Sequence, residues 1–289
     1  GPAHAERPSR APIHVVGLNS LEPRVLFTST THHASSAALF GYRMAFVDAD
    51  ASENPPVLVW NFIDDPFPLS GTTQPHRSSV LLNDRIAAWH TNSVDGLQIT
   101  LARLDEPGVE YVASERLNTD FEDMAIDGTC VSFAVFDGPP DYTISVYRSC
   151  LGPNGLTRSE IDGNLVRSDN GNPIYNANGV VAYGGAVAWS AGSFPPFVSS
   201  PVIWESARQR VTRLRPIDVF TVAMNRDSLL IGVPIGPFGG TSFLERYDRV
   251  RRTVTPIVSS AWYVQWVSMN GNSDIAYNTD HQTGDNQRT

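Results

Sequence analysis

Short hydrophobic runs alternate with turn residues along almost the whole chain. No segment carries apolar residues at the i, i+3, i+4 and i+7 spacing of an amphipathic helix with caps. Proline also interrupts most stretches longer than about 15 residues, which a helix interior does not tolerate. The pattern therefore predicts an all-β chain with essentially no helix.

One signature recurs along the sequence: an apolar strand, a tight turn of Asn, Asp or Gly, and a second strand that ends in a small residue and an aromatic one. Six copies occur, at SAALFGYRMAFVD (36–48), SSVLLNDRIAAWH (78–90), DMAIDGTCVSFAV (123–135), GVVAYGGAVAWSA (179–191), VAMNRDSLLIGVP (222–234) and WVSMNGNSDIAYN (266–278). Their aromatic positions, or the equivalent, follow each other at steps of 43, 44, 56, 42 and 46 residues. Steps of this size are typical of four-stranded propeller blades.

A second pair of strands follows five of the six signatures, and the remaining pair lies at 13–27, before the first signature. The sequence thus predicts a six-bladed β-propeller of four-stranded antiparallel blades, whose last blade is closed by the N-terminal strands. We expect residues 11–289 to form this single domain. Residues 1–10 read as a flexible tail whose Gly-Pro start resembles the remnant of a cleaved expression tag.

The turns inside the signatures contain residues that tolerate positive φ. The predicted hairpin turns are Asn83-Asp84, Asp127-Gly128, Gly184-Gly185, Asn225-Arg226-Asp227 and Asn270-Gly271-Asn272.

The strand pair IHVVGLNSLEPRVLF, read after the inner strand DIAYNTDHQTGDNQRT, resembles the TolB-type six-bladed β-propeller repeat. The resemblance covers residues 13–289, although the first, fourth and fifth copies lack the usual Ser-Pro-Asp-Gly turn. It implies the propeller fold. It leaves function open among periplasmic protein-binding modules, propeller caps of peptidases and polysaccharide lyases.

Composition narrows the partners and the chemistry. The net charge is −9, so we expect no nucleic-acid partner. The sequence contains no run of 18 apolar residues, so we expect no insertion into a membrane. All 21 basic residues are arginine. The absence of lysine excludes Schiff-base chemistry and a Walker-type phosphate loop. We expect a monomer.

The two cysteines lie on either side of the turn GPPD at 138–141. In a symmetric hairpin centred on this turn, Cys130 and Cys150 are opposite each other, so a cross-strand disulfide is the preferred interpretation. The alternatives are two buried free thiols or a chemically active thiol, although neither cysteine has a second Cys or a His at ligand spacing. A disulfide favours a periplasmic or secreted location.

The repeat assigns many polar residues to loops on one face of the predicted ring. The candidate ligand-binding residues there are His32, His33, His76, Asp48, Asp50, Asp137 and Asp280, and the catalytic candidates are His90 and His281. Converging imidazoles and carboxylates could hold a divalent cation, either Ca²⁺ or a transition metal, or supply a general base. The alternative is that polar residues simply occupy loops.

These observations favour an exported module that binds a protein or carbohydrate ligand through its loop-rich face. The alternative is a propeller enzyme, similar to a polysaccharide lyase or a hydrolase, that uses the face histidines with or without a divalent metal. No G-x-S-x-G, H-E-x-x-H or G-x-G-x-x-G motif supports serine hydrolase, zincin or dinucleotide chemistry.

Overall fold

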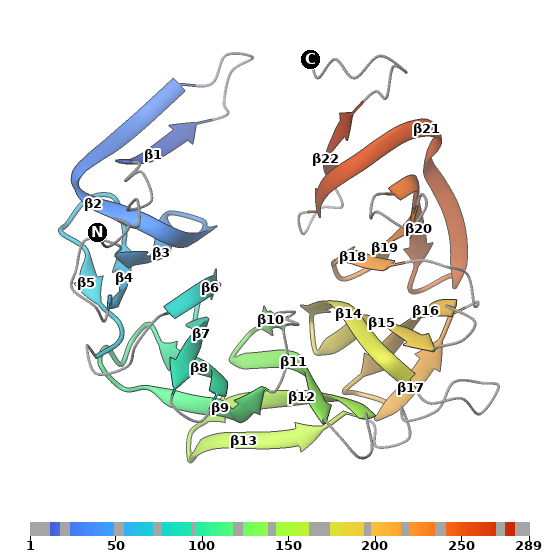
Figure 1. Cartoon of the computed structure of the whole chain (residues 1–289), viewed down its shortest axis with the longest axis horizontal. Helices are drawn as coiled ribbons and strands as arrows, with labels where there is room; N and C mark the ends of the chain where they lie inside the picture. Colours follow the sequence, from blue (N-terminus) through green and yellow to red (C-terminus); the bar gives the residue numbers. More distant parts are fainter. Residues whose placement is uncertain are drawn as a thin grey trace, which may run out of the picture. The chain divides into compact units, whose positions relative to one another are not determined.

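The computed structural model describes residues 12–17, 24–48, 55–71, 77–93, 96–117, 124–137, 143–161, 174–193, 198–214, 220–234, 241–269 and 275–280. These ranges contain strands and turns and no helix, which confirms the all-β prediction for them (Figure 1). Within them, no helix is present that could cross a membrane. The chain divides into two compact units, residues 1–116 and 117–289.

The first unit contains two antiparallel sheets whose strands are neighbours in chain order. The first sheet consists of β1 (Pro12–Gly17), β2 (Arg24–Phe40), β3 (Arg43–Asp48), β4 (Val57–Trp60) and β5 (Phe67–Pro68). The second consists of β6 (Arg77–Leu82), β7 (Ile86–Ser93), β8 (Gly96–Arg103) and β9 (Tyr111–Leu117), the last of which ends at the unit boundary.

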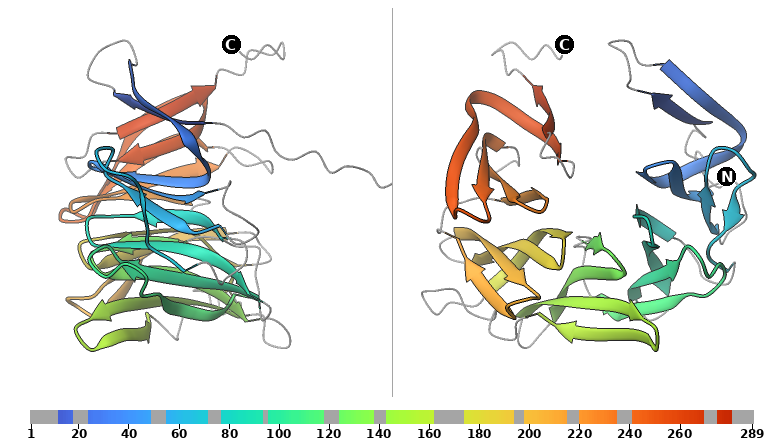
Figure 2. Two further views of the ribbon diagram at one scale, coloured as in Figure 1. Left: turned by 90° about the vertical axis from the view of Figure 1, so that its left-hand side faces the viewer. Right: turned by 180° about the vertical axis from the view of Figure 1, so that it is seen from behind.

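The second unit contains three antiparallel sheets. The first has β10 (Met124–Asp127), β11 (Cys130–Asp137), β12 (Thr143–Gly152) and β13 (Gly155–Glu160). The second has β14 (Ile174–Tyr183), β15 (Ala186–Ser193), β16 (Val198–Glu205) and β17 (Arg210–Arg213). The third has β18 (Phe220–Met224), β19 (Ser228–Pro234), β20 (Thr241–Asp248), β21 (Thr253–Met269) and β22 (Ile275–Asp280), and it lies beside the second sheet (Figure 2).

Two strands of 17 residues each take part in two pairings. The first part of β2 pairs with β1 and its second part with β3. In the same way, β21 pairs first with β20 and then with β22. The number of blades and the closure of the last one by the N-terminal strands stay predictions.

The predicted turns match the strand ends closely. Gly184 and Gly185 form the two-residue turn between β14 and β15, with φ values of 60° and 81°. Positive φ at both central positions defines the type I′ hairpin turn, for which Gly, Asn and Asp are the preferred residues. The turn between β18 and β19 is held by the Asn225 side-chain oxygen, which accepts the backbone N–H groups of Asp227 and Ser228 at 3.1 and 2.9 Å. The fifth predicted turn, Asn270–Asn272, lies outside the described residues.

The core forms between neighbouring sheets, where apolar residues alternate along the strands. The recurring aromatic position is buried in the described copies, with Phe46, Trp89 and Phe133 at 0% exposure, Trp189 at 1% and Ile231 at 4%. In the second unit, Val146, Trp189 and Trp204 belong to one cluster between sheets, and Ala188, Ile203 and Leu229 to the next. Burial explains why the described copies keep a large apolar residue at this position.

Candidate functional site

His90 lies inside a strand and not in the loop that the sequence suggested. Strand β7 runs from Ile86 to Ser93, so the strand continues for three residues beyond His90. The histidine pairs with Ser78 and Ile99, and its side chain is only 1% exposed. A general base must reach its substrate, so this burial lends no support to the catalytic role, which stays a prediction.

The other predicted site residues are placed in part. His32 and His33 belong to β2 and not to a loop. Asp48 ends β3 and is 6% exposed, whereas Asp137 and Asp280 end β11 and β22. Nothing is described of the side chains of His32, His33, Asp137 and Asp280, and Asp50, His76 and His281 lie outside the described ranges. Of the predicted catalytic and ligand-binding residues, only His90 and Asp48 have described side chains, and both are buried.

No metal site is found in the described ranges: no three side chains of His, Cys, Asp or Glu lie close enough there to hold an ion. The predicted divalent cation stays a prediction. The polar side chains that do converge lie at the other ends of the sheets, at the turns of the second unit.

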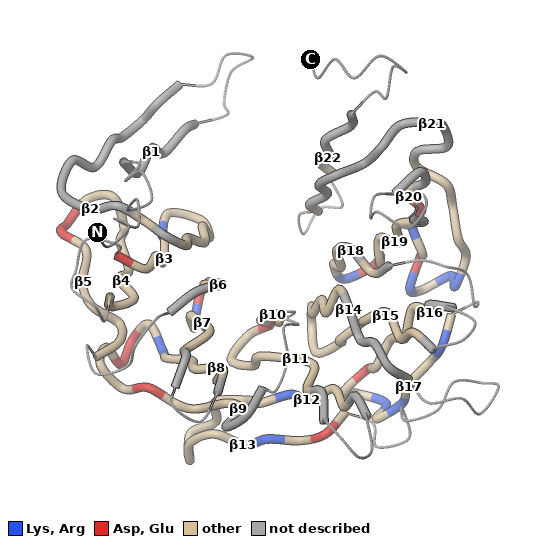
Figure 3. The backbone as a smooth tube through the Cα atoms, in the orientation of Figure 1, with Lys and Arg blue, Asp and Glu red and all other residues tan. Residues whose placement is uncertain are grey.

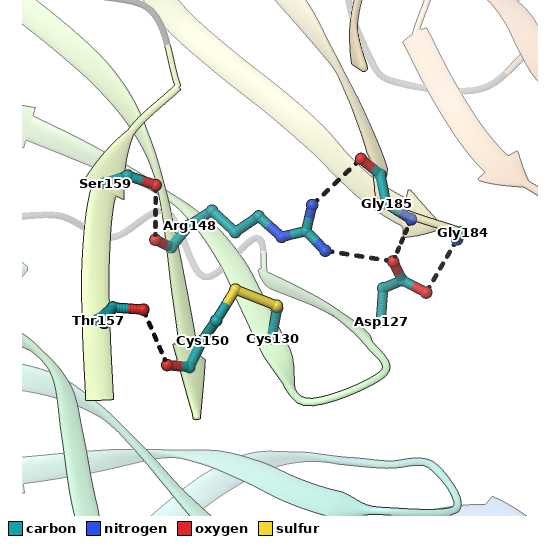
Figure 4. Close-up of a disulfide and its surroundings, with 8 residues drawn as sticks. All are labelled: Asp127, Cys130, Arg148, Cys150, Thr157, Ser159, Gly184 and Gly185. Atoms are coloured by element: carbon teal, nitrogen blue, oxygen red, sulfur yellow. Dashed lines mark hydrogen bonds and ion pairs between the residues drawn. A yellow bond between two sulfur atoms is a disulfide. The ribbon is translucent and has the colours of Figure 1, made fainter. Parts of the chain in front are cut away.

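Asp127 connects two neighbouring sheets at these turns. It is the last residue of β10, and its carboxylate accepts the backbone N–H of Gly184 at 2.9 Å and of Gly185 at 2.6 Å (Figure 4). Successive N–H groups in a glycine turn form a concavity that suits a carboxylate. The β14–β15 turn therefore offers two donors, and Asp127 fills them from the adjacent sheet.

Arg148 completes this connection from β12. Its Nη1 donates to the Gly185 carbonyl at 3.1 Å, and its Nη2 lies 3.4 Å from the Asp127 carboxylate (Figure 4). The guanidinium also lies 5.7 Å from the centre of the Trp204 ring, close enough for a cation–π interaction. Since the Arg148 side chain is only 10% exposed, these contacts replace most of its water. We call Asp127, Arg148, Gly184 and Gly185 the turn clamp.

The predicted disulfide lies next to the turn clamp and is confirmed. Cys130 and Cys150 are direct partners in the β11–β12 register, and their sulfur atoms are bonded. Cys130 is also opposite Asp127 across the β10–β11 turn. The disulfide thus fixes the start of β11 beside the carboxylate that reaches the neighbouring sheet.

A pocket of about 210 Å³ opens beside the same glycine turn, between the turns of the second and third sheets of this unit. It is lined by Gly184, Gly185, Ala186, Glu205, Ser206, Ala207, Arg208 and Arg249. Glu205 receives a hydrogen bond from Arg208 at 2.9 Å, and Arg249 Nη2 lies 3.8 Å from Glu205 Oε1. The pocket therefore presents one carboxylate and two guanidinium groups.

Arg249 is held firmly on the inner side of this pocket. Its Nη1 donates to the carbonyls of Asn225 and Arg226 at 2.7 and 3.0 Å, and its backbone N–H donates to Asp227 at 2.8 Å. The side chain is 11% exposed. These bonds fasten the β20–β21 turn to the β18–β19 turn and fix the direction of the guanidinium.

Burial and neighbouring charges act in opposite directions on the two inner arginines. Desolvation lowers the pKa of Arg148 from its ordinary value, while Asp127 raises it. Desolvation likewise lowers the pKa of Arg249, and Glu205 is the strongest of the charges that raise it. Guanidinium groups stay protonated in proteins, so both residues act as permanent cations.

Sequence reasoning missed this region because clusters of arginine, such as those at 208–215 and 246–252, are ordinarily solvated surface residues. Arg208 and Arg251 fit this description, since their side chains are 61% and 82% exposed, whereas the Arg249 side chain is only 11% exposed. Figure 3 colours the described arginine positions blue along the backbone. The sequence offered two signals: the pair Gly184-Gly185 in the turn of the fourth copy, and Asp127 at the equivalent turn of the third copy. Nothing in the sequence shows that the two meet.

An apolar group gathers at one end of the first sheet in the other unit. Leu39 and Ile63 are 62% and 88% exposed, Tyr42 is 89% exposed, and Phe40 and Phe67 are 47% and 37% exposed. They come from the ends of β2 and β5 and from the turns β2–β3 and β4–β5, which lie at the same end of this sheet. We call these five residues the apolar end.

The turn that carries Ile63 is ordered. Asn61 accepts the N–H groups of Ile63 and Asp64 at 3.0 and 2.9 Å, and Trp60 donates to the Asp64 carbonyl at 2.9 Å. Phe62 has a φ of 65°, a conformation that a bulky residue rarely adopts. Strain of this kind persists only where surrounding contacts impose it, and it is a reason to suspect function.

Antiparallel sheets of four or five strands, connected in chain order, define the chain as a β-propeller. The propeller domain of the trilobed protease from Pyrococcus furiosus is similar, with a TM-score of 0.60 and 10% identity over 88% of this chain and 79% of that one. A structure from a study of two prolyl endopeptidases matches with a TM-score of 0.56 and 9% identity, over 86% and 39% of the two chains. Acylaminoacyl peptidase from Pyrococcus horikoshii matches with a TM-score of 0.54 and 11% identity, over 87% and 43%.

These likenesses concern the fold. The chain spans less than half the length of both peptidases just described. No family model and no curated protein matches the sequence. The TolB-type resemblance accordingly stays a prediction within the propeller fold.

Proposed function

We propose that the chain is an exported β-propeller that binds a protein partner and that the apolar end of the first sheet is its contact surface. The observation that carries the proposal is the exposure of these five apolar side chains in one place. Single exposed apolar residues are ordinary on protein surfaces, but several from neighbouring segments at one end of a sheet favour an interaction site.

The surroundings of the apolar end fit a protein interface. Leu39 is opposite Met44 in the register and Met44 is opposite Trp60, so the exposed group continues a buried apolar cluster. The exposed charged residues Arg43, Asp64 and Asp65 lie beside it in the chain. An apolar centre with a charged rim is the usual composition of protein–protein contacts.

A carbohydrate partner has less support among the described residues. Tryptophan offers the largest ring for stacking on a sugar, but Trp60, Trp89, Trp189 and Trp204 are all at most 6% exposed. The exposed aromatic rings of Tyr42, Phe40 and Phe67 belong to the apolar end, where they stand beside aliphatic side chains. The side chains of Trp262 and Trp266 lie outside the described set. Export is supported by the Cys130–Cys150 disulfide, because such bonds persist in oxidising compartments.

A peptide-display selection tests this proposal. Peptides are selected on the wild-type chain, and their affinities are then measured for the double variant Tyr42→Ser/Ile63→Ser. Loss of two apolar anchors should weaken binding at least tenfold, because each buried apolar side chain contributes about 1.5–3 kcal/mol. The selected peptides should themselves be rich in apolar residues.

The matched control is Val109→Ser/Val112→Ser, which alters two residues that are each 44% exposed: Val112 in β9 of the same unit, and Val109 in the turn before it. This control should bind the peptides as the wild type does. If the selection returns only peptides that bind wild type and Tyr42→Ser/Ile63→Ser equally, the apolar end is not the contact surface.

A further inference from the structure

We propose that the pocket beside the Gly184–Gly185 turn binds a small zwitterion that carries an ammonium and a carboxylate, of the kind represented by a free α-amino acid. The pocket lies in the second unit, so this proposal is independent of the apolar end and of the protein partner proposed above. The reasons lie in the size of the pocket, its two incompletely bonded charges and the rigidity of its walls.

The volume suits a ligand of a few heavy atoms. A water molecule occupies about 30 Å³ of liquid, so a pocket of about 210 Å³ has the space of several waters. Glycine residues at one wall make this space possible. A Cβ added to Gly185 would lie 2.7 Å from Ser206 Oγ, and Gly185 already has a φ of 81°.

Two opposite charges in the pocket have hydrogen-bonding capacity left over. Glu205 Oε1 and Arg249 Nη2 are 3.8 Å apart, which exceeds hydrogen-bond distance. In the described part of the chain, neither atom has a hydrogen bond to another residue. Their partner atoms are occupied: Glu205 Oε2 accepts from Arg208, and Arg249 Nη1 donates to two carbonyls.

The walls of the pocket are already fixed by other bonds. The N–H groups of Gly184 and Gly185 are used by Asp127, and the Gly185 carbonyl accepts from Arg148 and from the Ser206 N–H. These groups therefore keep their positions whether or not a ligand is present. A preorganised site loses little entropy on binding, so few contacts suffice for measurable affinity.

The chemistry of the two open atoms selects the ligand. Glu205 Oε1 needs a donor, and Arg249 Nη2 needs an acceptor, for which a carboxylate matches the planar guanidinium. Arg208 adds a second cation at the exposed rim. The Glu205 carboxylate would repel a simple anion, and the two arginines would repel a simple amine. A zwitterion places its ammonium beside Glu205 and its carboxylate beside the arginines.

The test compares one zwitterion with its two halves. The full-length chain is titrated with L-alanine, with propionate, which lacks the amine, and with ethylamine, which lacks the carboxylate. Binding is followed by the amide NMR signals of Gly184, Gly185 and Ser206. L-alanine should produce a saturable shift at these amides, and each half should bind at least tenfold more weakly, because each loses one charge-assisted hydrogen bond.

Two variants test the residues. Glu205→Gln should weaken L-alanine binding at least tenfold and not weaken propionate, while Arg208→Gln should weaken both. Arg251→Gln, at an 82% exposed position outside the pocket lining, is the matched control and should leave L-alanine binding unchanged. Thermal unfolding of each variant checks that the fold is retained.

Any of three results would overturn the proposal. The first is the absence of a saturable shift with L-alanine, which would leave only water in the pocket. The others are propionate binding as tightly as L-alanine, which would make the pocket a simple anion site, and full L-alanine binding by Glu205→Gln. None of these outcomes affects the apolar end, which the peptide selection tests separately.

Discussion

Replacement of Asp127 by alanine should lower the free energy of unfolding by about 3 kcal/mol. The change removes the carboxylate that accepts the backbone N–H groups of Gly184 and Gly185. It also leaves the Arg148 guanidinium without its anion, although the Arg148 side chain is only 10% exposed. Breaking a largely buried ion pair costs more than the pair contributes, because the remaining charge is desolvated without compensation. Chemical unfolding followed by tryptophan fluorescence measures the loss.

The matched control is Asp84→Ala, in the turn between β6 and β7. Its side chain is 64% exposed and lies 3.9 Å from Arg85, so its loss should change stability by less than about 0.5 kcal/mol. In a double-mutant cycle, Arg148→Met should remove much of the penalty of Asp127→Ala, because no buried charge then remains. An Asp127→Ala protein as stable as wild type would show that the turn clamp does not hold the two sheets together.

Removal of the disulfide should have a similar effect. The Cys130–Cys150 bond closes a segment with a sequence separation of 20, and cross-linking a loop of this size contributes about 3 kcal/mol in the chain-entropy description. Cys130→Ala/Cys150→Ala should therefore unfold at a lower temperature than the oxidised wild type. Differential scanning calorimetry measures the difference.

The reductant supplies an internal control for this prediction. Dithiothreitol should lower the unfolding temperature of the wild type towards that of the double variant and leave the variant itself unchanged. The chain has no other cysteines, so no other thiol can account for the shift. If reduced and oxidised wild type unfold together, the bond contributes nothing to stability.

The sheets and turns could be predicted because their causes are local. A glycine pair at Gly184–Gly185 specifies a type I′ turn by itself, and a buried aromatic such as Trp89 or Trp189 in each copy marks the strand that faces the core. The Cys130–Cys150 pairing followed from counting residues on either side of one turn. Each inference needed only a short stretch of sequence.

The turn clamp and the pocket could not be predicted because they join residues from different sheets. Asp127 and Gly185 are 58 positions apart, and Glu205 ends β16 whereas Arg249 lies in the β20–β21 turn. The sequence contains the acid, the glycines and the arginines but gives no distance between them. His90 shows the same limit: its position was known, yet its burial depended on where β7 ended.

The two long strands have a mechanical consequence. Because β2 is one uninterrupted strand that pairs with β1 and then with β3, a pulling force applied to the N-terminal hairpin passes into the first sheet through covalent bonds. Strand β21 does the same for the hairpin that it forms with β22. A load on either terminal hairpin is thereby transmitted along the backbone into a whole sheet, with no flexible linker to absorb it.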